Sequence, residues 1–409
     1  MNYIKLRKNN LRVENVSALT IAQKYKTPFY CYSLAQLKNN FSAFSNSFKT
    51  IKPLICFSVK SNSNVTLLKE LKKMGSGADV VSAGELLKAI KAGISPKKIV
   101  FSGVGKTEDE IRLAIKKGVL LINMESENEA NLINKISKKM GITTAVGIRL
   151  NPNITGKTHK KISTGSKYDK FGLSYKDCIT FCKKTNSLKN LKLNGLSVHI
   201  GSQITNIKPF EQVLGVLNKI INETKINFKF IDLGGGMGIS YSDEEKKLDL
   251  NRYAKLVNNF LKNKKAQIIF EPGRFIAGNT SVLISKIIYI KKSKNKNFII
   301  LDAGMNDLMT PALYDEHHKI IPLKKNKKRI IDNLEFVGPI CESSDKFLNK
   351  KGFQKIKEGD CVAITDVGAY GMSLTSNYNT RPIIAEIMVN GSKHKLIKKR
   401  QSLENLINN

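Results

Sequence analysis

Lys60 is the first residue of this sequence that suggests chemistry. The stretch FSVKSN (57–62) closes the apolar run LICFSV with a lysine that is followed at once by small polar residues, although lysine rarely leaves water. A desolvated lysine is a nucleophile that forms Schiff bases, either directly with a substrate carbonyl or with pyridoxal phosphate. The alternative is a lysine whose stem lies along apolar surface while its ammonium group reaches water.

A glycine-rich turn and an arginine form a second candidate site. DLGGGMG (232–238) follows a predicted strand, and its glycines would let backbone amides approach an anion closely. The turn is not a dinucleotide fingerprint, because Ile239 stands where the third glycine is needed, and no Gly-Lys-Ser/Thr follows for a P-loop. EPGR (271–274) adds Gly273 and Arg274 at the next strand end. Together the two segments predict a phosphate site on the late strands.

Two further side chains suit a pyridine ring. A carboxylate at Glu271 would keep a pyridine nitrogen protonated, so that the ring accepts electrons from a developing carbanion. A salt bridge between Glu271 and Arg274 is the alternative. His199 would lie flat on the ring, or it is a core histidine with satisfied hydrogen bonds. Only the combination with Lys60 and the glycine-rich turn favours a cofactor over these alternatives.

An alternation of short apolar runs and amphipathic helical patterns must position these residues. Thr107 with Glu110, and Ser126 with Glu129, have the spacing of capping boxes. Eight strand–helix steps of this kind predict an α/β fold, the (β/α)8 barrel. The expected strands lie within residues 54–60, 77–82, 99–103, 120–125, 145–151, 194–201, 228–236 and 267–274.

Polar residues fall at the ends of the predicted strands. In such barrels the carboxyl ends of the strands form the active-site face, so a lysine at a strand end is both desolvated and useful. The residues that end the strands are Lys60, Ser82, Gly103, Glu125, Asn151, His199, Gly234–Gly236, and Glu271 with Arg274.

The chain of 409 residues exceeds what one hydrophobic core usually serves, which predicts two domains. After Arg274 the helical patterns give way to β-rich runs such as VLISKIIYI, NFIILDAG and DCVAITDVGAY. The first thirty or so residues contain similar runs and are too short to fold alone. We therefore predict a barrel over residues 32–274 and an all-β domain built from residues 1–31 and 275–409.

The composition excludes several classes of protein. Lys and Arg number 69 against 33 Asp and Glu, a formal charge of +36, but the lysines are spread along the chain without aromatic interleaving or a nucleic-acid motif. No specific nucleic-acid binding is therefore predicted. No apolar segment is long enough for a signal peptide or a membrane span, which indicates a cytoplasmic protein. The six cysteines form no CxxC pair, so neither a metal site nor a disulfide framework is predicted.

The motifs in order resemble those of the pyridoxal-phosphate-dependent diaminopimelate decarboxylases. The resemblance runs from about residue 27 to the end, and the wider family shares an alanine-racemase-like barrel with a β domain and includes ornithine and arginine decarboxylases. The motifs that carry it are FSVKSN, GADVVSAGE, FSGVGKT, RLNPN, the H-x-x-I-x-T-G…DKFG segment (159–172), GLSVHIGSQI, DLGGGMGI, EPGR, DAGMNDL…PALY, GPICESSD and DVGAYGMSLTSNYN.

The resemblance implies a role for each candidate residue. Lys60 would bind the cofactor as a Schiff base, His199 would stack on its ring, and Glu271 would hold the ring nitrogen. Cys341 would be the proton donor to the reacting carbon, and Cys341 and Glu342 would enter the site from the other subunit of a homodimer. The phosphate would be surrounded by Ser202, Gly235, Gly236, Gly273, Arg274 and Tyr370. The substrate would be bound by Arg274, Tyr314, Glu342 and Tyr370.

The implied reaction is decarboxylation of meso-2,6-diaminopimelate to L-lysine and CO2, the last step of lysine biosynthesis. Glu271 separates the chain from alanine racemases, which place an arginine at the ring nitrogen, and Glu342 separates it from ornithine decarboxylases, which have aspartate there. Thr310 departs from the family, which has an arginine that pairs with the distal substrate carboxylate. The alternatives are decarboxylation of another diamino acid, of the ornithine or arginine type, and a non-catalytic protein that binds pyridoxal phosphate.

Overall fold

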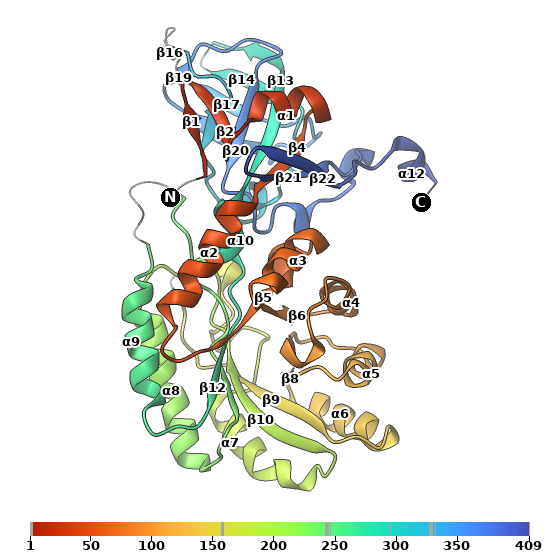
Figure 1. The fold of residues 1–409 in the computed structure, drawn as a ribbon, viewed down its shortest axis with the longest axis vertical. Helices are drawn as coiled ribbons and strands as arrows, with labels where there is room; N and C mark the ends of the chain where they lie inside the picture. Colours follow the sequence, from red (N-terminus) through yellow and green to blue (C-terminus); the bar gives the residue numbers. More distant parts are fainter. Residues whose placement is uncertain are drawn as a thin grey trace. The chain divides into compact units, whose positions relative to one another are not determined.

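The structure is a computed structural model, and its chain divides into two compact units (Figure 1). It describes residues 3–156, 159–241, 245, 247–294, 296–326, 330–331 and 333–408. The barrel unit comprises Phe41–Ile239 and Lys246–Phe275. The sheet unit comprises Met1–Asn40, Ser240–Glu245 and Ile276–Asn409.

A closed barrel of eight strands forms the centre of the barrel unit. Its strands follow the order β10-β11-β12-β5-β6-β7-β8-β9, and all neighbours are parallel. The predicted barrel is thereby confirmed. The strands are β5 (Leu54–Ser58), β6 (Gly77–Val80), β7 (Ile99–Phe101), β8 (Leu121–Met124), β9 (Thr144–Leu150), β10 (Leu191–Val198), β11 (Phe230–Asp232) and β12 (Gln267–Phe270).

Most helices of the barrel unit begin after a residue whose side chain accepts a hydrogen bond from an amide of the first turn. Thr107 and Glu110 form the predicted capping box, and the Ser126 side chain accepts a hydrogen bond from the Glu129 amide, which satisfies amides that a helix leaves unpaired. The helices are α3 (Val65–Lys73), α4 (Ala83–Lys91), α5 (Glu108–Lys117), α6 (Glu127–Lys139), α7 (Tyr175–Lys184), α8 (Lys208–Thr224), α9 (Leu250–Leu261) and α10 (Arg274–Ala277).

The sheet unit is organised by a nine-stranded sheet. β4 (Phe29–Ser33) pairs with β13 (Ser281–Lys292) and with β21 (Ala385–Asn390), so the N-terminal segment completes the C-terminal sheet as predicted. The remaining strands of this sheet are β14 (Asn297–Leu301), β15 (Ile320–Pro322), β17 (Leu334–Val337), β18 (Lys346–Lys350), β20 (Cys361–Thr365) and β22 (Lys393–Lys398).

Smaller elements complete the description. β1 (Ile4–Arg7), β2 (Asn10–Val13) and β3 (Val16–Ser17) form a three-stranded sheet, and β16 (Ile330–Ile331) pairs with β19 (Phe353–Gln354). The further helices are α1 (Ala18–Tyr25), α2 (Leu34–Ser47), α11 (Thr310–Tyr314) and α12 (Leu403–Ile407). Neither α1 nor α2 was expected from the sequence, and the boundary between the units at Asn40 lies within α2.

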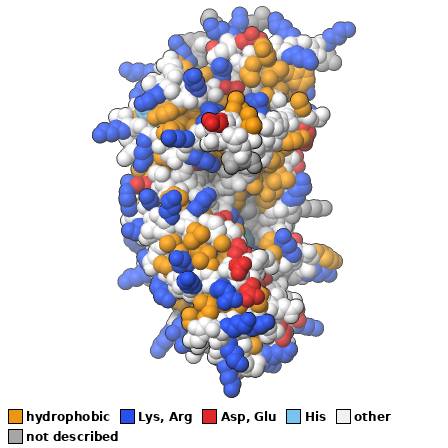
Figure 2. All heavy atoms as spheres, turned by 90° about the vertical axis from the view of Figure 1, so that its right-hand side faces the viewer, with side chains coloured by type: hydrophobic (Ala, Val, Ile, Leu, Met, Phe, Trp, Pro, Cys, Tyr) orange, Lys and Arg blue, Asp and Glu red, His pale blue; other side chains and the backbone are white. Residues whose placement is uncertain are grey.

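The surface carries the basic excess of the composition. On the face drawn in Figure 2, lysine and arginine side chains are scattered among apolar and acidic ones rather than gathered in one stripe.

All six cysteines are free thiols. Within the described ranges, no helix has the length and apolar character needed to cross a bilayer.

Candidate active site

Lys60 lies in a short 3₁₀ turn (Val59–Ser61) that directly follows β5. Its Nζ is 3.6 Å from the Asp79 carboxylate, and its side chain is 35% exposed while that of Asp79 is fully buried. Asp79 also accepts a hydrogen bond of 2.7 Å from the Ser58 hydroxyl. A lysine can therefore end this buried strand because a carboxylate on the next strand compensates its charge.

Three acidic residues meet inside the barrel unit: Asp79 on β6, Asp232 on β11 and Glu271 directly after β12. The Asp232 and Glu271 side chains are joined by a hydrogen bond. Burial raises the pKa of Asp232 to about 6 and that of Glu271 well above its ordinary value. Because two buried carboxylates in contact cannot both ionise cheaply, this contact favours one proton shared between the two groups.

Asn123 on β8 organises the polar groups around this pair. Its amide nitrogen donates to Asp232 at 2.9 Å and to the Ser197 hydroxyl at 3.2 Å. The Ser102 hydroxyl donates to Glu271 at 3.4 Å. Asp79 Oδ1 and Asn123 Oδ1 are buried and have no hydrogen-bond partner in the described part of the chain, and such groups are costly unless a ligand or water satisfies them.

His199 follows β10 directly and is held by a backbone amide. Its Nδ1 lies 3.0 Å from the Gly235 nitrogen, which donates to it. Burial lowers the pKa of His199 well below its ordinary value, and the positive charges of Lys60 and Arg149 lower it further. The imidazole is therefore neutral at physiological pH, which suits a ring that stacks on an aromatic group rather than one that carries charge.

The glycine-rich turn leaves no space for side chains. A Cβ on Gly235 would lie 2.2 Å from the Glu271 carbonyl oxygen, and one on Gly236 would lie 2.6 Å from the Gly201 carbonyl oxygen. Gly236 also has φ +92°, a conformation that side-chain-bearing residues rarely adopt. The glycines are required because the turn after β11 lies close to the backbone that follows β12 and β10. The turn therefore presents a backbone surface without side chains.

Arg274 supplies a buried cation beside this surface. It is 3% exposed at the start of α10, and its Nε donates to the Ser202 hydroxyl at 3.3 Å. Gly273 packs against Ser61, because a Cβ at Gly273 would lie 2.9 Å from the Ser61 Cβ. The structure thus brings Gly273, Arg274 and Ser202 together, and Gly273 lies beside the turn that carries Lys60.

The donor set of the barrel unit fits pyridoxal phosphate. An amine, a proton-holding carboxyl pair and a neutral imidazole suit the aldehyde, the ring nitrogen and the ring face of that molecule. A buried guanidinium and a glycine cradle suit its phosphate. Within the described ranges, no group of three or more His, Cys, Asp and Glu residues is placed to hold a metal ion.

Arg149, which sequence reasoning missed, forms a buried ion pair with Glu125, one of the predicted strand-end residues. Arg149 Nη1 lies 2.7 Å from Glu125 Oε1, and the guanidinium lies over the Phe171 ring, 4.7 Å from its centroid. Glu125 also accepts the Gly172 amide at 2.8 Å. The pair therefore ties the predicted 159–172 segment to β8 and β9. A charged residue within the apolar run AVGIRLN was the available signal.

The other predicted residues belong to the sheet unit. Tyr314 ends α11, and Tyr370 follows β20 with φ +60°. Cys341 and Glu342 are exposed in the turn between β17 and β18. The sheet unit thus contains Tyr314, Tyr370, Cys341 and Glu342, and the barrel unit contains the other candidates.

Thr310 is buried in the sheet unit, at the start of α11. Its side chain has no exposed area, and its hydroxyl lies 3.1 Å from His318 Nε2. The other imidazole nitrogen lies 2.9 Å from the Thr365 carbonyl oxygen. Thr310 therefore belongs to a buried hydrogen-bond chain that links α11 to β20.

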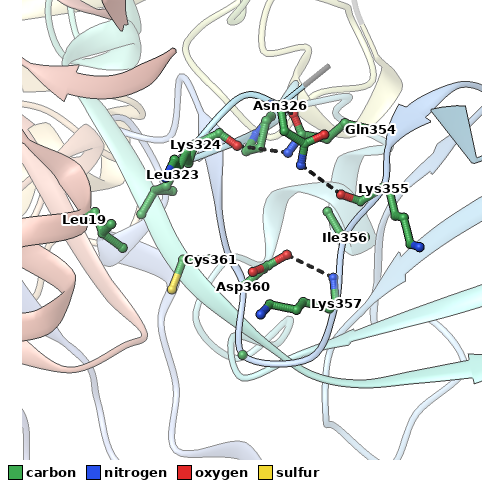
Figure 3. Close-up of a pocket in the computed structure, with 12 residues that line it drawn as sticks. Leu19, Leu323, Lys324, Asn326, Gln354, Lys355, Ile356, Lys357, Asp360 and Cys361 are labelled. Atoms are coloured by element: carbon green, nitrogen blue, oxygen red, sulfur yellow. Dashed lines mark hydrogen bonds between the residues drawn. The ribbon is translucent and has the colours of Figure 1, made fainter. Parts of the chain in front are cut away.

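A separate cavity of about 490 Å³ lies in the sheet unit (Figure 3). Among the residues that line it are Lys324, Lys355 and Lys357, and the Asp360 carboxylate accepts the Lys357 amide at 2.9 Å. Its described lining contains none of the predicted site residues. The cavity is therefore distinct from the site predicted from the sequence.

Comparison with known proteins gives a consistent set of relatives. The family described as pyridoxal-dependent decarboxylase, pyridoxal binding domain, matches residues 34–278. A diaminopimelate decarboxylase from Aquifex aeolicus is 39% identical over 409 residues, which cover 99% of this chain and 96% of that protein.

Solved structures agree over the same extent. A diaminopimelate decarboxylase from Helicobacter pylori complexed with L-lysine is 40% identical, with a TM-score of 0.90 over 95% of this chain and 98% of that one. A diaminopimelate decarboxylase from M. jannaschii in co-complex with L-lysine is 34% identical, with a TM-score of 0.93 over 99% and 96%. The similarity therefore covers the residues of both units.

Proposed function

Since the chain belongs to the diaminopimelate decarboxylase family of pyridoxal-dependent decarboxylases, we propose that it converts meso-2,6-diaminopimelate to L-lysine and CO2. The observation that carries the proposal is the meeting of Lys60, Asp79 and the Asp232–Glu271 pair inside one barrel. Burying three carboxyl groups beside a lysine does not stabilise a barrel that has only a structural role, because every buried carboxyl group loses its hydration.

Pyridoxal phosphate supplies, when bound, a conjugated electron sink for the bond to the leaving carboxylate. Lys60 Nζ would hold the cofactor covalently, and Arg274, Ser202, Gly235, Gly236 and Gly273 would bind its phosphate. The Asp79 carboxylate would position the Lys60 amine before the reaction and compensate its positive charge.

Glu271 would face the ring nitrogen of the cofactor. The hydrogen bond between Glu271 and Asp232 places a proton between two buried carboxyl groups. The pair could therefore keep the ring nitrogen protonated without taking a proton from water. His199 would cover the ring face, and its bond from Gly235 fixes the imidazole plane.

The sheet unit would supply the substrate contacts. We propose that Tyr314, Tyr370 and Arg274 bind substrate, that Glu342 binds the ammonium group at the far stereocentre, and that the Cys341 thiol returns a proton to the carbon that loses CO2. Cys341 and Glu342 would act in the site of the partner in a homodimer. The same proposal makes the protein a cytoplasmic enzyme that completes lysine biosynthesis.

The distal carboxylate of the substrate needs a partner other than Thr310. The Thr310 hydroxyl is buried and bonded to His318, and a threonine cannot form the bidentate pair that an arginine forms with a carboxylate. Another cationic or amide group of the protein must therefore bind it.

The experiment is CO2 release by the protein loaded with pyridoxal phosphate, offered meso-diaminopimelate, ornithine and arginine separately. Lysine formed from diaminopimelate alone supports the proposal. Turnover of ornithine or arginine instead would keep the cofactor site and reject the named substrate. The Lys60→Ala variant is the control, and it should neither release CO2 nor retain cofactor after borohydride reduction.

A further inference from the structure

The turn between β17 and β18 carries Cys341 and Glu342, two of the four sheet-unit residues with proposed roles. The side chains of Cys341 and Glu342 are exposed, so packing does not fix them. The Cys341 amide donates to Asn379 Oδ1 at 2.9 Å, and the Glu342 carboxylate accepts hydrogen bonds from the Ser344 and Tyr378 hydroxyl groups. An exposed turn that must present a thiol and a carboxylate needs a rigid support beneath it.

Asp345 lies beneath this turn and is 3% exposed. Its Oδ2 accepts the Ile340 amide at 2.7 Å, directly before Cys341, and its Oδ1 accepts the Met305 amide at 2.7 Å. Its own amide donates to the Glu342 carbonyl oxygen at 3.1 Å, and its carbonyl oxygen accepts the Gly338 amide at 3.1 Å. Asp345, at the end of the turn, therefore bonds to its first residue and to a residue on either side of Cys341, and it anchors the turn to Met305.

Gly338 provides the space that this carboxylate occupies. A Cβ on Gly338 would lie 2.3 Å from Asp345 Oδ2 and 2.4 Å from Oδ1. Gly338 has no left-handed φ, so the close approach of the carboxylate, rather than backbone conformation, requires glycine there. The sequence G-P-I-C-E-S-S-D (338–345) thus begins and ends with the two residues that fit each other.

We propose that Asp345 is a positioning residue that fixes the backbone of the Cys341–Glu342 turn for catalysis. The inference rests on the proposed function, because it assumes that Cys341 and Glu342 act on substrate. Asp345 itself touches neither substrate nor cofactor in this proposal. It acts by accepting two backbone amides with one carboxylate. Burial raises the pKa of Asp345 to about 6, so the group is charged at neutral pH, and hydrogen bonds to a charged group are stronger than neutral ones.

Asp345→Asn is the informative substitution. An asparagine can accept one of the two amides, but its NH2 group then faces the other N–H, so one anchor of the turn is lost. We expect kcat/KM to fall on the order of 100-fold, the scale expected when catalytic groups are misplaced by about 1 Å. Both kcat and KM should change, because the turn carries a proton donor and a substrate-binding carboxylate.

Asp360→Asn is the matched control. Asp360 also accepts a backbone amide, that of Lys357 at 2.9 Å, in a turn of the same unit beside the cavity of Figure 3. This variant should keep the kinetic constants of the wild type. The yield of borohydride-trapped cofactor should be unchanged in both variants, because Lys60 lies in the other unit.

The rate of Cys341 alkylation by iodoacetamide, followed by peptide mass spectrometry, gives a readout independent of turnover. Cys341 in the loosened turn of Asp345→Asn should react with iodoacetamide several-fold faster than Cys341 of the wild type. A folded Asp345→Asn protein with wild-type kinetic constants and alkylation rate would overturn the inference. If it does not fold, Gly338→Ala tests the same contact from the other side, and wild-type behaviour of that variant would equally overturn it.

Failure of the inference is distinguishable from failure of the proposed function. If Cys341→Ala and Glu342→Gln both turn over diaminopimelate at the wild-type rate, the proposed roles of the turn are wrong. The alkylation rate then still decides whether Asp345 holds the turn. If those two variants are impaired and Asp345→Asn is not, only the positioning role falls.

Discussion

Lys106→Met should destabilise the barrel unit strongly. The Lys106 side chain has no exposed area, and its ammonium group lies 2.6 Å from Glu129 Oε1, 2.6 Å from the Gly103 carbonyl oxygen and 2.7 Å from the Asn123 carbonyl oxygen. It therefore joins the ends of β7 and β8 to the first turn of α6. Methionine keeps most of the stem and removes every one of these bonds.

The magnitude follows from the burial of the partner. Glu129 is 8% exposed, so without Lys106 its charge remains buried and uncompensated. Removing one partner of such a pair costs about 3–5 kcal/mol. Lys184→Met is the matched control, because Lys184 pairs with Glu127 of the same helix at 3.4 Å while both side chains are more than half exposed. Its cost should stay below about 1 kcal/mol.

Hydrogen exchange followed by mass spectrometry measures the effect within one unit. Peptides from β8 and α6 should exchange roughly 100-fold to several thousand-fold faster in Lys106→Met, since each 1.4 kcal/mol is a factor of ten. The double variant Lys106→Met/Glu129→Gln should recover part of the loss, because it removes the stranded charge. Equal protection in the Lys106 and Lys184 variants would refute the argument that burial sets the value of this ion pair.

Three further results are expected. Mixing Lys60→Ala and Cys341→Ala subunits should restore CO2 release through hybrid dimers, and no recovery after confirmed subunit exchange would argue against a shared site. Thr310→Arg should lower the thermal unfolding temperature without raising turnover, because overpacking beside His318 costs about 1–3 kcal/mol. Burial raises the pKa of Asp307 from 3.8 to about 7, so its stabilising proton is present at low pH and lost as the pH rises towards 7. In urea unfolding at pH 4.5 and 8, Asp307→Asn should remove about 3 kcal/mol of this pH dependence, and an unchanged pH dependence would contradict the assignment.

The barrel was predictable because local signals agree with the global fold. The strand–helix rhythm, the capping residues and the polar strand ends all indicated the same architecture. The helix α2 was missed, although its apolar residues have helical spacing. Asn and Ser dilute that pattern and have low helix propensity. The apolar residues concerned are Leu34, Leu37, Phe41 and Phe44.

The polar interior of the site was only partly predictable. Lys60, His199 and Glu271 stand at strand ends, where the barrel rule directs attention. Asp79 lies within β6 and Asp232 is the last residue of β11, and the sequence does not show which positions on different strands face the same space. The bond of Thr310 to His318 was equally hidden, because it depends on how α11 packs on β20 rather than on any local pattern.

A period of two along the strands nevertheless connects these residues. Cys56 of β5 and Leu121 of β8 belong to a buried apolar cluster within the barrel unit. Two residues further along each strand lie Ser58, bonded to Asp79, and Asn123, bonded to Asp232, as alternation of side chains across a strand requires. A shift of one residue in β5 would turn Cys56 and Ser58 away from the interior, so strand register places Ser58 beside Asp79. Lys60 lies in the 3₁₀ turn that begins directly after Ser58, so the same register sets where that turn begins.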